Sequence, residues 1–430
     1  MTKIKLQSLS GMRDILPKEQ VYFKKVQKSV ESISNYYSFE RIDTPIMESA
    51  EVFIKGTGGA TDIVEKEMYT FKTKGGELLA LRPEFTAGIV RSYIEHGMFT
   101  LPQPVKLWSI GPLFRHERPQ AGRYRQLHQF NFEVLGDKNP SIDGQVIKMC
   151  YDVLKDLGFK NISIEVNSIG DKECRPHFKK ILTNYFRSRK SSLCSDCLRR
   201  LRENPLRILD CKEEKCQNVK AGAPQIIDHL CEQCHIHCKQ LLEFLDELEL
   251  PYTLNPYLVR GFDYYTKTVF EIVEKSEIGA SQGSLVGGGR YDDLVKLLGG
   301  RDTPACGAAG GIDRIVNLMK EREAKNPLDI VKKQNEPKIF LAQLGQLAKR
   351  KSLKLFEEFR VAKVPVAESF SKDSLRTQLG VADKMKIKWV LIFGQKEALE
   401  DFITLRDMET GVQKEIKLDK VVKEMKSKLK

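Results

Sequence analysis

The sequence contains no long run of apolar residues. None approaches the ~18–20 consecutive apolar residues that a membrane-spanning helix needs, so we do not expect a membrane protein. The first residues, MTKIKLQSLSGMRD, also lack the apolar core of a secretory signal. We therefore expect a cytoplasmic protein.

Two common nucleotide-binding motifs are missing as well. The chain has no G-x-x-x-x-G-K-[ST] loop, and no G-x-G-x-x-G leads from a strand into a helix. Any nucleotide site in this protein would therefore be neither a P-loop nor a dinucleotide-binding crevice.

The composition is that of an ordinary folded protein with an excess of positive charge. The 430 residues, 41% hydrophobic and 30% charged, are enough for two or three domains. The formal net charge of +13 favours a polyanionic partner, because Lys and Arg displace the counterions of phosphates; a basic protein without such a partner is the alternative. Residues 337–430 hold 21 basic and 13 acidic residues, so much of the excess lies there.

The hydrophobic pattern divides the chain into blocks. Residues 19–38 carry apolar residues near helical spacing, and alternating, strand-like segments follow up to residue 171. Residues 172–252 are charged, cysteine-rich and helical in pattern. The polar segment 326–336 indicates a linker, and 337–430 alternates strand and helix, which favours a small α/β domain with a partly parallel sheet.

The stretch RYRQLHQFNFEVLG at 123–136 alternates like a strand but has an unusual polar face. Its apolar face carries Phe130, Phe132 and Val134, while the other face carries two amides and a carboxylate from Gln129, Asn131 and Glu133. A solvent-exposed strand is the plain interpretation. The alternative is that this face lines a pocket for a small polar molecule.

Two further segments show a similar polar face if they are extended. Glu84 and Thr86 would share a face in RPEFT, and Arg260, Phe262 and Tyr264 would share one in VRGFDYYTK. Because three separate segments show the same pattern, we favour neighbouring strands of an antiparallel sheet that line one concave site.

A second group of residues suits phosphate. Guanidinium groups bind phosphate oxygens bidentately and stay charged at any working pH. Such groups occur in FRHER, GRYR and GIDRI, as Arg115, Arg118, Arg123, Arg125 and Arg314. The glycines of SLVGGGRYD and GAAGG would allow the backbone to approach a ligand closely.

Several motifs in the right order resemble the class II aminoacyl-tRNA synthetases, and among them the histidyl-tRNA synthetase family. The segment around Thr44-Pro45 is similar to motif 1 (38–50), FRHERPQAGRYRQLHQ to motif 2 (111–136) and GAAGGIDRI to motif 3 (305–320). LVRGFDYYTKTVFE and GGGRYDDL resemble two signatures specific to the histidine enzymes. The resemblance covers nearly the whole chain.

The resemblance implies an α+β fold with three parts. The catalytic domain, 1–325, would hold an antiparallel class II sheet of six or seven strands flanked by helices, with the helical domain 172–252 inserted in it. The linker 326–336 would lead to an α/β anticodon-binding domain at 337–430. The protein would be a homodimeric histidine–tRNA ligase that uses ATP and Mg²⁺ to join L-histidine to tRNA(His).

The resemblance also implies roles for individual residues. Arg115 and Arg260 would be catalytic, since they would neutralise charge at the α-phosphate of ATP. ATP would be bound by Arg115, Glu117, Arg123 and Arg314. Histidine would be bound by Glu84, Thr86, Gln129, Glu133, Arg260, Tyr264 and Tyr265, with Glu133 and Tyr264 on the imidazole. The acceptor end of the tRNA would meet Arg118, Gln120 and Arg125.

Three places depart from the family pattern: Phe85, Asp313 in place of a more usual glutamate, and Asn131-Phe132 in place of smaller residues. Phe85 stands in RPEFT where the family has glycine. Its bulk either reshapes the pocket wall beside the ammonium site or turns away from it.

A regulatory protein is the alternative function. Synthetase-like subunits of histidine biosynthesis resemble this family without its activity, but they lack the C-terminal domain and usually parts of the ATP and tRNA motifs. Both are present in this chain.

The cysteines suggest a metal site through their spacing alone. Eight of the ten cysteines fall between Cys174 and Cys238, in LCSDC, CKEEKC and LCEQCHIHC among others. Two C-x2-C pairs favour one structural zinc, for which the first choice of ligands is Cys194, Cys197, Cys231 and Cys234. Cys211 and Cys216 are alternative ligands, and His235, His237 and Cys238 are spare. Free buried cysteines are the other interpretation.

Overall fold

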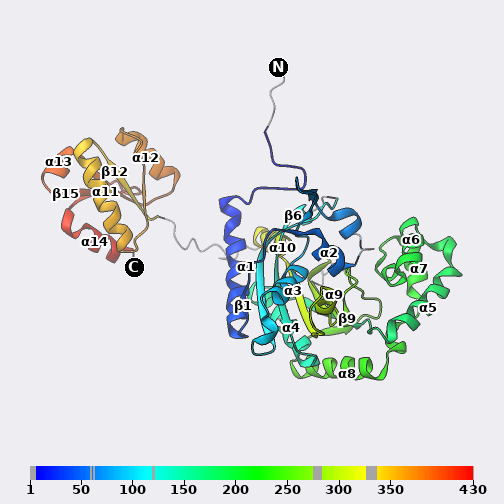
Figure 1. Cartoon of the computed structure of the whole chain (residues 1–430). Coiled ribbons are helices and arrows are strands. Elements are labelled where there is room, and N and C mark those ends of the chain that lie inside the picture. The colour runs from blue at the N-terminus through cyan, green and yellow to red at the C-terminus, as the bar shows by residue number, and fades with distance from the viewer. Residues whose placement is uncertain are drawn as a thin grey trace, which may run out of the picture. The chain divides into compact units, whose positions relative to one another are not determined.

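The structure is a computed structural model that describes residues 6–58, 61, 63–118, 122–274, 283–325 and 337–429. The chain divides into two compact units, Met1–Pro327 and Leu328–Lys430 (Figure 1). In the described residues, no helix is both long enough and apolar enough to span a membrane.

The first unit is built on an eight-stranded sheet. In spatial order its strands are β1 (Glu40–Arg41), β5 (Val105–Phe114), β6 (Gln126–Leu135), β11 (Ala305–Gly311), β10 (Ser284–Arg290), β9 (Thr266–Glu274), β7 (Ile162–Ser168) and β8 (Tyr252–Leu254). The six central strands are antiparallel, while the short edge strands β1 and β8 pair in parallel with β5 and β7. With these two edge strands the sheet has eight strands, whereas six or seven were expected. The edge strands are too short to show an alternating pattern in the sequence.

Helices pack on this sheet and beside it. Four of them are in contact with one another or with the central strands: α1 (Pro17–Tyr36), α4 (Pro140–Asp156), α8 (Glu232–Glu247) and α10 (Ile312–Lys325). Three others pack together near a small sheet: α2 (Ala50–Thr57), α3 (Thr86–Glu95) and α9 (Leu294–Leu297). The small sheet has the order β2 (Met47–Ser49), β4 (Leu78–Leu81) and β3 (Thr70–Lys72). Short helical turns are η1 (Ile63–Glu67) and η2 (Met98–Thr100).

The segment between β7 and β8 is helical, as its pattern predicts. It contains α5 (Cys174–Arg187), η3 (Lys190–Ser192), α6 (Ser195–Glu203), η4 (Pro205–Asp210), α7 (Glu214–Ala221), η5 (Ile226–His229) and α8. Helices α5 to α7 form a lobe at one side of the unit, and α8 runs back towards the sheet (Figure 1). We call residues 171–247 the insert.

The second unit is an α/β domain with a partly parallel sheet. The strands lie in the order β13 (Val366–Glu368), β12 (Ile339–Gln343), β14 (Trp389–Phe393), β15 (Phe402–Asp407) and β16 (Gln413–Lys417). The first three are parallel to one another and the last two antiparallel. Its helical segments are α11 (Gln346–Val361), α12 (Leu375–Lys384), α13 (Gln395–Leu399), η7 (Leu418–Lys420) and α14 (Val421–Lys428).

Candidate active site

The polar face of β6 is buried in the middle of the sheet. Asn131 and Glu133 are only 2% and 1% exposed, although their side chains lie opposite the apolar face of Phe130, Phe132 and Val134. Burial of a carboxylate and an amide is unfavourable unless they find polar partners. The exposed-strand interpretation is therefore wrong for this segment.

Glu133 is held by three side chains from three parts of the chain. Its Oε1 accepts hydrogen bonds from the Thr86 hydroxyl at 2.6 Å and from the Asn131 amide at 3.0 Å. Its carboxylate also accepts one from the Tyr291 hydroxyl. Burial raises the pKa of Glu133 to about 7, against the lowering effect of these donors. The group is thus poised to lose or gain a proton near neutral pH.

Glu84 and Thr86 lie at the start of α3 and not on an extended strand. The Glu84 carboxylate accepts hydrogen bonds from the backbone N–H groups of Thr86 at 2.6 Å and Ala87 at 2.7 Å, so it caps the helix. Burial raises its pKa, while these bonds and the positive charge of Arg115 act in the opposite direction. The expectation of a shared strand face was wrong here, because β4 ends at Leu81 and α3 begins at Thr86. Both side chains nevertheless lie close to the buried carboxylate of Glu133.

Phe85 is buried and lies against an arginine. Its ring is 1% exposed and its centroid is 4.4 Å from the guanidinium carbon of Arg82. Of the two expectations for Phe85, the structure shows the side chain packed in the core.

Residues 260–264 also lack strand structure, contrary to expectation. The strand β9 begins only at Thr266, and the preceding residues form turns. Tyr264 stacks on Phe262, with ring centroids 5.1 Å apart, and its ring is 4.7 Å from Tyr265 and 5.6 Å from Tyr291. The hydroxyl groups of Tyr264 and Tyr291 are buried, and burial raises the pKa of both far above the ordinary value. These rings form an aromatic wall beside Glu133.

Arg260 lies over the glycine strand β10. It forms an ion pair with Glu271 on β9, and its guanidinium carbon is 5.9 Å from the centre of the Tyr265 ring. A Cβ atom on Gly287 would lie 2.4 Å from its Nη2, so a larger residue there would push the guanidinium aside. Among the described residues, its Nε is buried and has no hydrogen-bond partner.

The remaining arginines surround the same region. Arg115 donates from Nε to the carbonyl of Pro83 at 2.8 Å and lies 3.9 Å from the carboxylate of Glu117, which in turn lies 3.5 Å from Arg123. Burial lowers the pKa of Arg314, and the nearby charge of Arg123 lowers it further. Two neighbouring guanidinium groups favour an anion between them.

The predicted tRNA contacts are more dispersed. Arg118 is exposed. Arg125 lies against backbone, with its Nη1 3.3 Å from the carbonyl of Ser10 and its Nε 3.5 Å from that of Glu117. Gln120 lies outside the described residues.

Gln129 shares the polar face of β6 with Glu133. It is half-buried, and its cross-strand neighbours are Gly111 on β5 and Gly311 on β11. Glycine on both sides leaves its amide side chain uncovered from the neighbouring strands. The position suits a group that must reach a ligand.

Three residues of the site, Tyr291, Glu271 and Gly307, were not predicted from the sequence. Tyr291 and Glu271 lie within the signature segments GGGRYDDL and LVRGFDYYTKTVFE, but the sequence pattern assigns no role to these two residues. Gly307 lies opposite Glu133 on β11, and a Cβ atom there would be 1.8 Å from Oε2 of Glu133. Nothing local in the sequence distinguishes Gly307 from the other glycines of this strand.

With this geometry established, comparison with known proteins identifies the family. The family model described as histidyl-tRNA synthetase matches residues 11–172 and 190–315. The chain belongs to the histidyl-tRNA synthetase family. A second model, an anticodon-binding domain, matches residues 338–428.

Full-length relatives agree. Histidine–tRNA ligases of Dehalococcoides mccartyi (strain BAV1) and Aquifex aeolicus are each 42% identical to this chain, over 98% and 97% of it and 100% of their own lengths. The crystal structure of apo histidyl-tRNA synthetase from S. aureus is 34% identical, has a TM-score of 0.79, and is matched over 98% of this chain and 100% of its own. The predicted class II fold of the histidyl-tRNA synthetase family is therefore confirmed.

The insert of this histidyl-tRNA synthetase family member carries two groups of potential metal ligands. One contains Cys194, Cys197, Cys211 and Cys216, and the other contains Asp171, Cys174, Cys231 and Cys234; in each group the ligand atoms lie within 4.8 Å of one another. The first-choice quartet is therefore wrong in its grouping. The folded insert brings the alternatives Cys211 and Cys216 to the first C-x2-C pair and leaves the second pair with other partners.

The spare histidine His237 has a different partner. Its Nε2 lies 2.8 Å from the buried carboxylate of Asp143 on α4 and 3.2 Å from the hydroxyl of Thr268 on β9. The side chain thus fastens α8 to the catalytic sheet and is not in either metal-ligand group.

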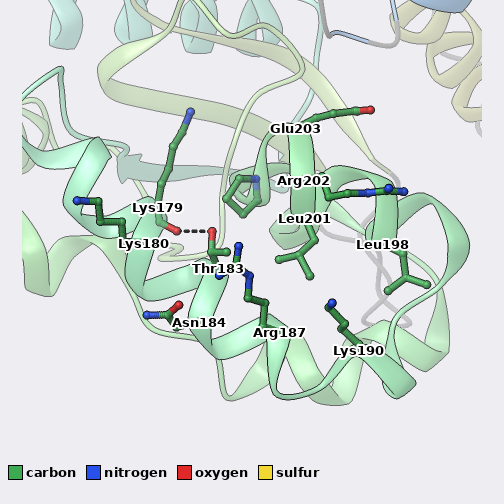
Figure 2. Close-up of a pocket in the computed structure, with 11 residues that line it drawn as sticks. Lys179, Lys180, Thr183, Asn184, Arg187, Lys190, Leu198, Leu201, Arg202 and Glu203 are labelled. Carbon is green, nitrogen blue, oxygen red and sulfur yellow. Dashed lines mark hydrogen bonds between the residues drawn. The ribbon is translucent and has the colours of Figure 1, made fainter.

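A basic hollow of about 890 Å³ opens on the insert (Figure 2). Its basic lining residues come from α5, η3 and α6: Lys179, Lys180, Arg187, Lys190 and Arg202. A single acidic residue, Glu203, is among the lining residues. The surplus of positive charge suits a polyanion.

Proposed function

We propose that the protein is a histidine–tRNA ligase with its amino-acid site between β6, the start of α3 and the aromatic wall. The observation that carries the proposal is the buried carboxylate of Glu133 beside the rings of Tyr264 and Tyr291, next to an arginine-rich region. A carboxylate and a phenol side by side suit an imidazole, which offers both a donor and an acceptor nitrogen.

The positions of the arginine side chains support the following chemistry for the activation of histidine. The histidine carboxylate attacks the α-phosphorus of MgATP, pyrophosphate leaves, and histidyl-adenylate remains. No protein nucleophile is needed, so the task of the side chains is alignment and charge neutralisation. We assign this role to Arg115 and Arg260, and we assign ATP binding also to Glu117, Arg123 and Arg314. The unpartnered Nε of Arg260 supports its role.

Histidine would be held at both of its ends. Glu133 accepts from one ring nitrogen and Tyr264 bonds the other, with Tyr265 beside them. Glu84, Thr86 and Gln129 bind the ammonium group; a carboxylate can accept about four hydrogen bonds, so Glu84 can cap α3 and still bind a ligand. An apolar amino acid would leave these buried groups unpaired, which supports rejection by a factor of ~10⁴ or more.

Transfer to RNA is the second step. A ribose hydroxyl of the terminal adenosine of tRNA(His) attacks the activated carbonyl carbon, and AMP leaves. Arg118, Gln120 and Arg125 are our candidates for the acceptor end, and the C-terminal unit for the anticodon arm. The basic hollow on the insert supports further phosphate contacts. We further propose that the protein acts as a cytoplasmic homodimer.

The first cysteine group supports a structural zinc. A zinc ion with bonds of about 2.3 Å to four sulfurs holds those sulfurs roughly 3.8 Å apart, and the sulfurs of Cys194 and Cys211 lie 3.9 Å apart. Two sulfurs accept backbone N–H groups: Cys194 from Cys197 at 3.4 Å and Cys216 from Cys194 at 3.3 Å. Such bonds favour thiolates. We assign the zinc to Cys194, Cys197, Cys211 and Cys216.

One assay tests the ligase proposal. ATP–pyrophosphate exchange is measured with each of the twenty amino acids, and we expect exchange with histidine alone. Histidine binding without exchange would support the regulatory alternative instead. Attachment of histidine to tRNA, measured separately, tests the second step.

A further inference from the structure

The second cysteine group lies where the insert joins the catalytic sheet. Asp171 follows the end of β7 by three residues, and Cys174 is the first residue of α5. Cys231 is the N-cap of α8, and Cys234 lies in the first turn of that helix. The outgoing and returning segments of the insert thus meet at these four side chains, whose ligand atoms lie within 4.8 Å of one another.

The local backbone holds these groups in place. The backbone N–H of Cys231 donates to the sulfur of Cys174 at 3.0 Å, which joins the two segments directly. Oδ1 of Asp171 accepts from the N–H groups of Glu173 at 2.9 Å and Cys174 at 3.4 Å, which orients the carboxylate. Gly170 has φ +64°, and a Cβ atom on it would lie 2.8 Å from the Cβ of Cys174. Only glycine lets the chain turn so closely here.

Three thiols and one carboxylate are a donor set that zinc accepts. Zinc binds cysteine sulfur and aspartate oxygen in tetrahedral sites, and a C-x2-C pair at the start of a helix is a frequent source of two ligands. The first cysteine group is complete without Cys231 and Cys234, so this second C-x2-C pair has its own partners. A disulfide would use only two of the three sulfurs and would leave the carboxylate without a role.

We propose that Asp171, Cys174, Cys231 and Cys234 bind a second zinc ion, which fastens the two ends of the insert to each other beside the sheet. We call the place where these two ends of the insert meet the neck. Binding of zinc at the neck does not depend on the ligase reaction.

The neck is attached to the catalytic sheet by contacts on both sides. The carbonyl of Gly170 accepts a hydrogen bond from the backbone N–H of Lys267 on β9, at 2.7 Å. Further along α8, His237 bonds Asp143, and Asp143 forms a buried ion pair with Arg290 at 2.5 Å. A metal at the neck would therefore fix the orientation of the basic lobe relative to the residues around Tyr291.

Metal stoichiometry of the purified full-length protein is the primary test. We expect two zinc ions per chain. X-ray absorption should show an average first shell of mostly sulfur with some oxygen, because one site has four sulfurs and the other three. A single zinc per chain, or two with an all-sulfur shell, would overturn the proposal. Neither measurement needs a variant, so a folding defect cannot obscure the result.

Variants assign the metals to their sites. Cys231→Ser and Cys197→Ser should each reduce the zinc content from two to one, since each removes a ligand from a different group. Cys238→Ser is the matched control: Cys238 is a buried cysteine of the same helix α8 outside both groups, so two zinc ions should remain. Two zinc ions in Cys231→Ser would contradict the assignment.

The position of the metal gives a further readout. Hydrogen exchange of residues 169–176 and 229–236 should rise at least several-fold in Cys231→Ser relative to Cys238→Ser, while β6 stays protected. Equal exchange in the two variants would show that the site does not fasten the neck.

Discussion

The hydroxyl group of Tyr291 donates a hydrogen bond to the carboxylate of Glu133, a residue 158 positions earlier in the chain. The bond links a turn after β10 to the centre of β6. Arg290, fully buried and paired with Asp143 and Asp292, fixes the turn that presents Tyr291. Glu133 thus has a defined orientation before any ligand arrives.

Loss of this bond should weaken the histidine site. A hydrogen bond to a charged group contributes about 1.5–3 kcal/mol, so Tyr291→Phe should lower kcat/KM for histidine in the exchange assay roughly 10- to 100-fold. Tyr93→Phe is the control, because Tyr93 is equally buried but its hydroxyl lies near Gln103. Equal activity of the two variants would remove Tyr291 from the site.

Gly307 should be intolerant of even a methyl group. In Gly307→Ala the new Cβ would lie 1.8 Å from Oε2 of Glu133 and 2.6 Å from the carbonyl oxygen of Phe132, so the carboxylate must move. We expect a loss of stability of about 1–3 kcal/mol and weaker histidine binding. Gly380→Ala, in α12 of the C-terminal unit, where an added Cβ has no heavy atom within 4 Å, should do neither. Calorimetric titration with histidine and thermal unfolding of both variants provide the comparison.

Arg260 should matter for chemistry more than for binding. If it neutralises charge in the transition state, Arg260→Ala should lower kcat of exchange by ~10²–10³-fold, while calorimetry still detects histidine binding. Arg360→Ala, an exposed arginine of the C-terminal unit, should leave exchange unchanged. Unaltered exchange in Arg260→Ala would exclude the residue from catalysis.

Glu133 should make stability depend on pH. Its pKa of about 7 exceeds the ordinary value of 4.5, so the folded state holds the proton more tightly than the unfolded chain. The resulting stabilisation is fully present below pH ~4.5 and is lost as pH rises through ~7, a change of about 3 kcal/mol. The variant Glu133→Gln has no titrating group at this position, so its stability lacks this dependence on pH. Its free energy of unfolding in urea should therefore rise relative to wild type between pH 5 and 8; a constant difference would contradict the raised pKa.

The basic hollow should contribute to RNA affinity. Replacement of Lys180, Arg187 and Arg202 by Glu should weaken tRNA binding and reduce the slope of log K against log salt by about one per lost phosphate contact. Exchange without tRNA should not change, because these residues lie on the insert. An unchanged salt slope would show that the hollow does not bind the RNA.

The sequence predicted those parts of the site that depend on local pattern. The alternation of β6 located Gln129, Asn131 and Glu133 correctly, because one buried face of a strand must be apolar whatever lies on the other. The segment from Arg260 to Tyr264 was predicted as a strand because its alternate residues would share one face. Its turns are stabilised by contacts with distant residues, such as the edge-to-face contact of Tyr264 with Tyr291, which no short window contains.

The grouping of the cysteines could not be obtained from spacing. Two C-x2-C pairs look like one site because a linear pattern does not show that α6 and α7 bring Cys211 and Cys216 to the first pair. Asp171 carries no signal at all, since it is a single aspartate after a strand. The edge strands β1 and β8 lie in segments that were read as extended, but two or three residues are too few to show which strand they pair with.

The glycines of β10 and β11 limit how this site can be redesigned. Gly287 leaves space for the guanidinium of Arg260, and Gly307 leaves space for the carboxylate of Glu133. Directed evolution towards another amino acid therefore has little freedom at these two positions, since any replacement adds atoms where charged groups already lie. A change of substrate specificity would have to begin at residues such as Thr86 or Tyr264, which can be replaced by residues with smaller side chains.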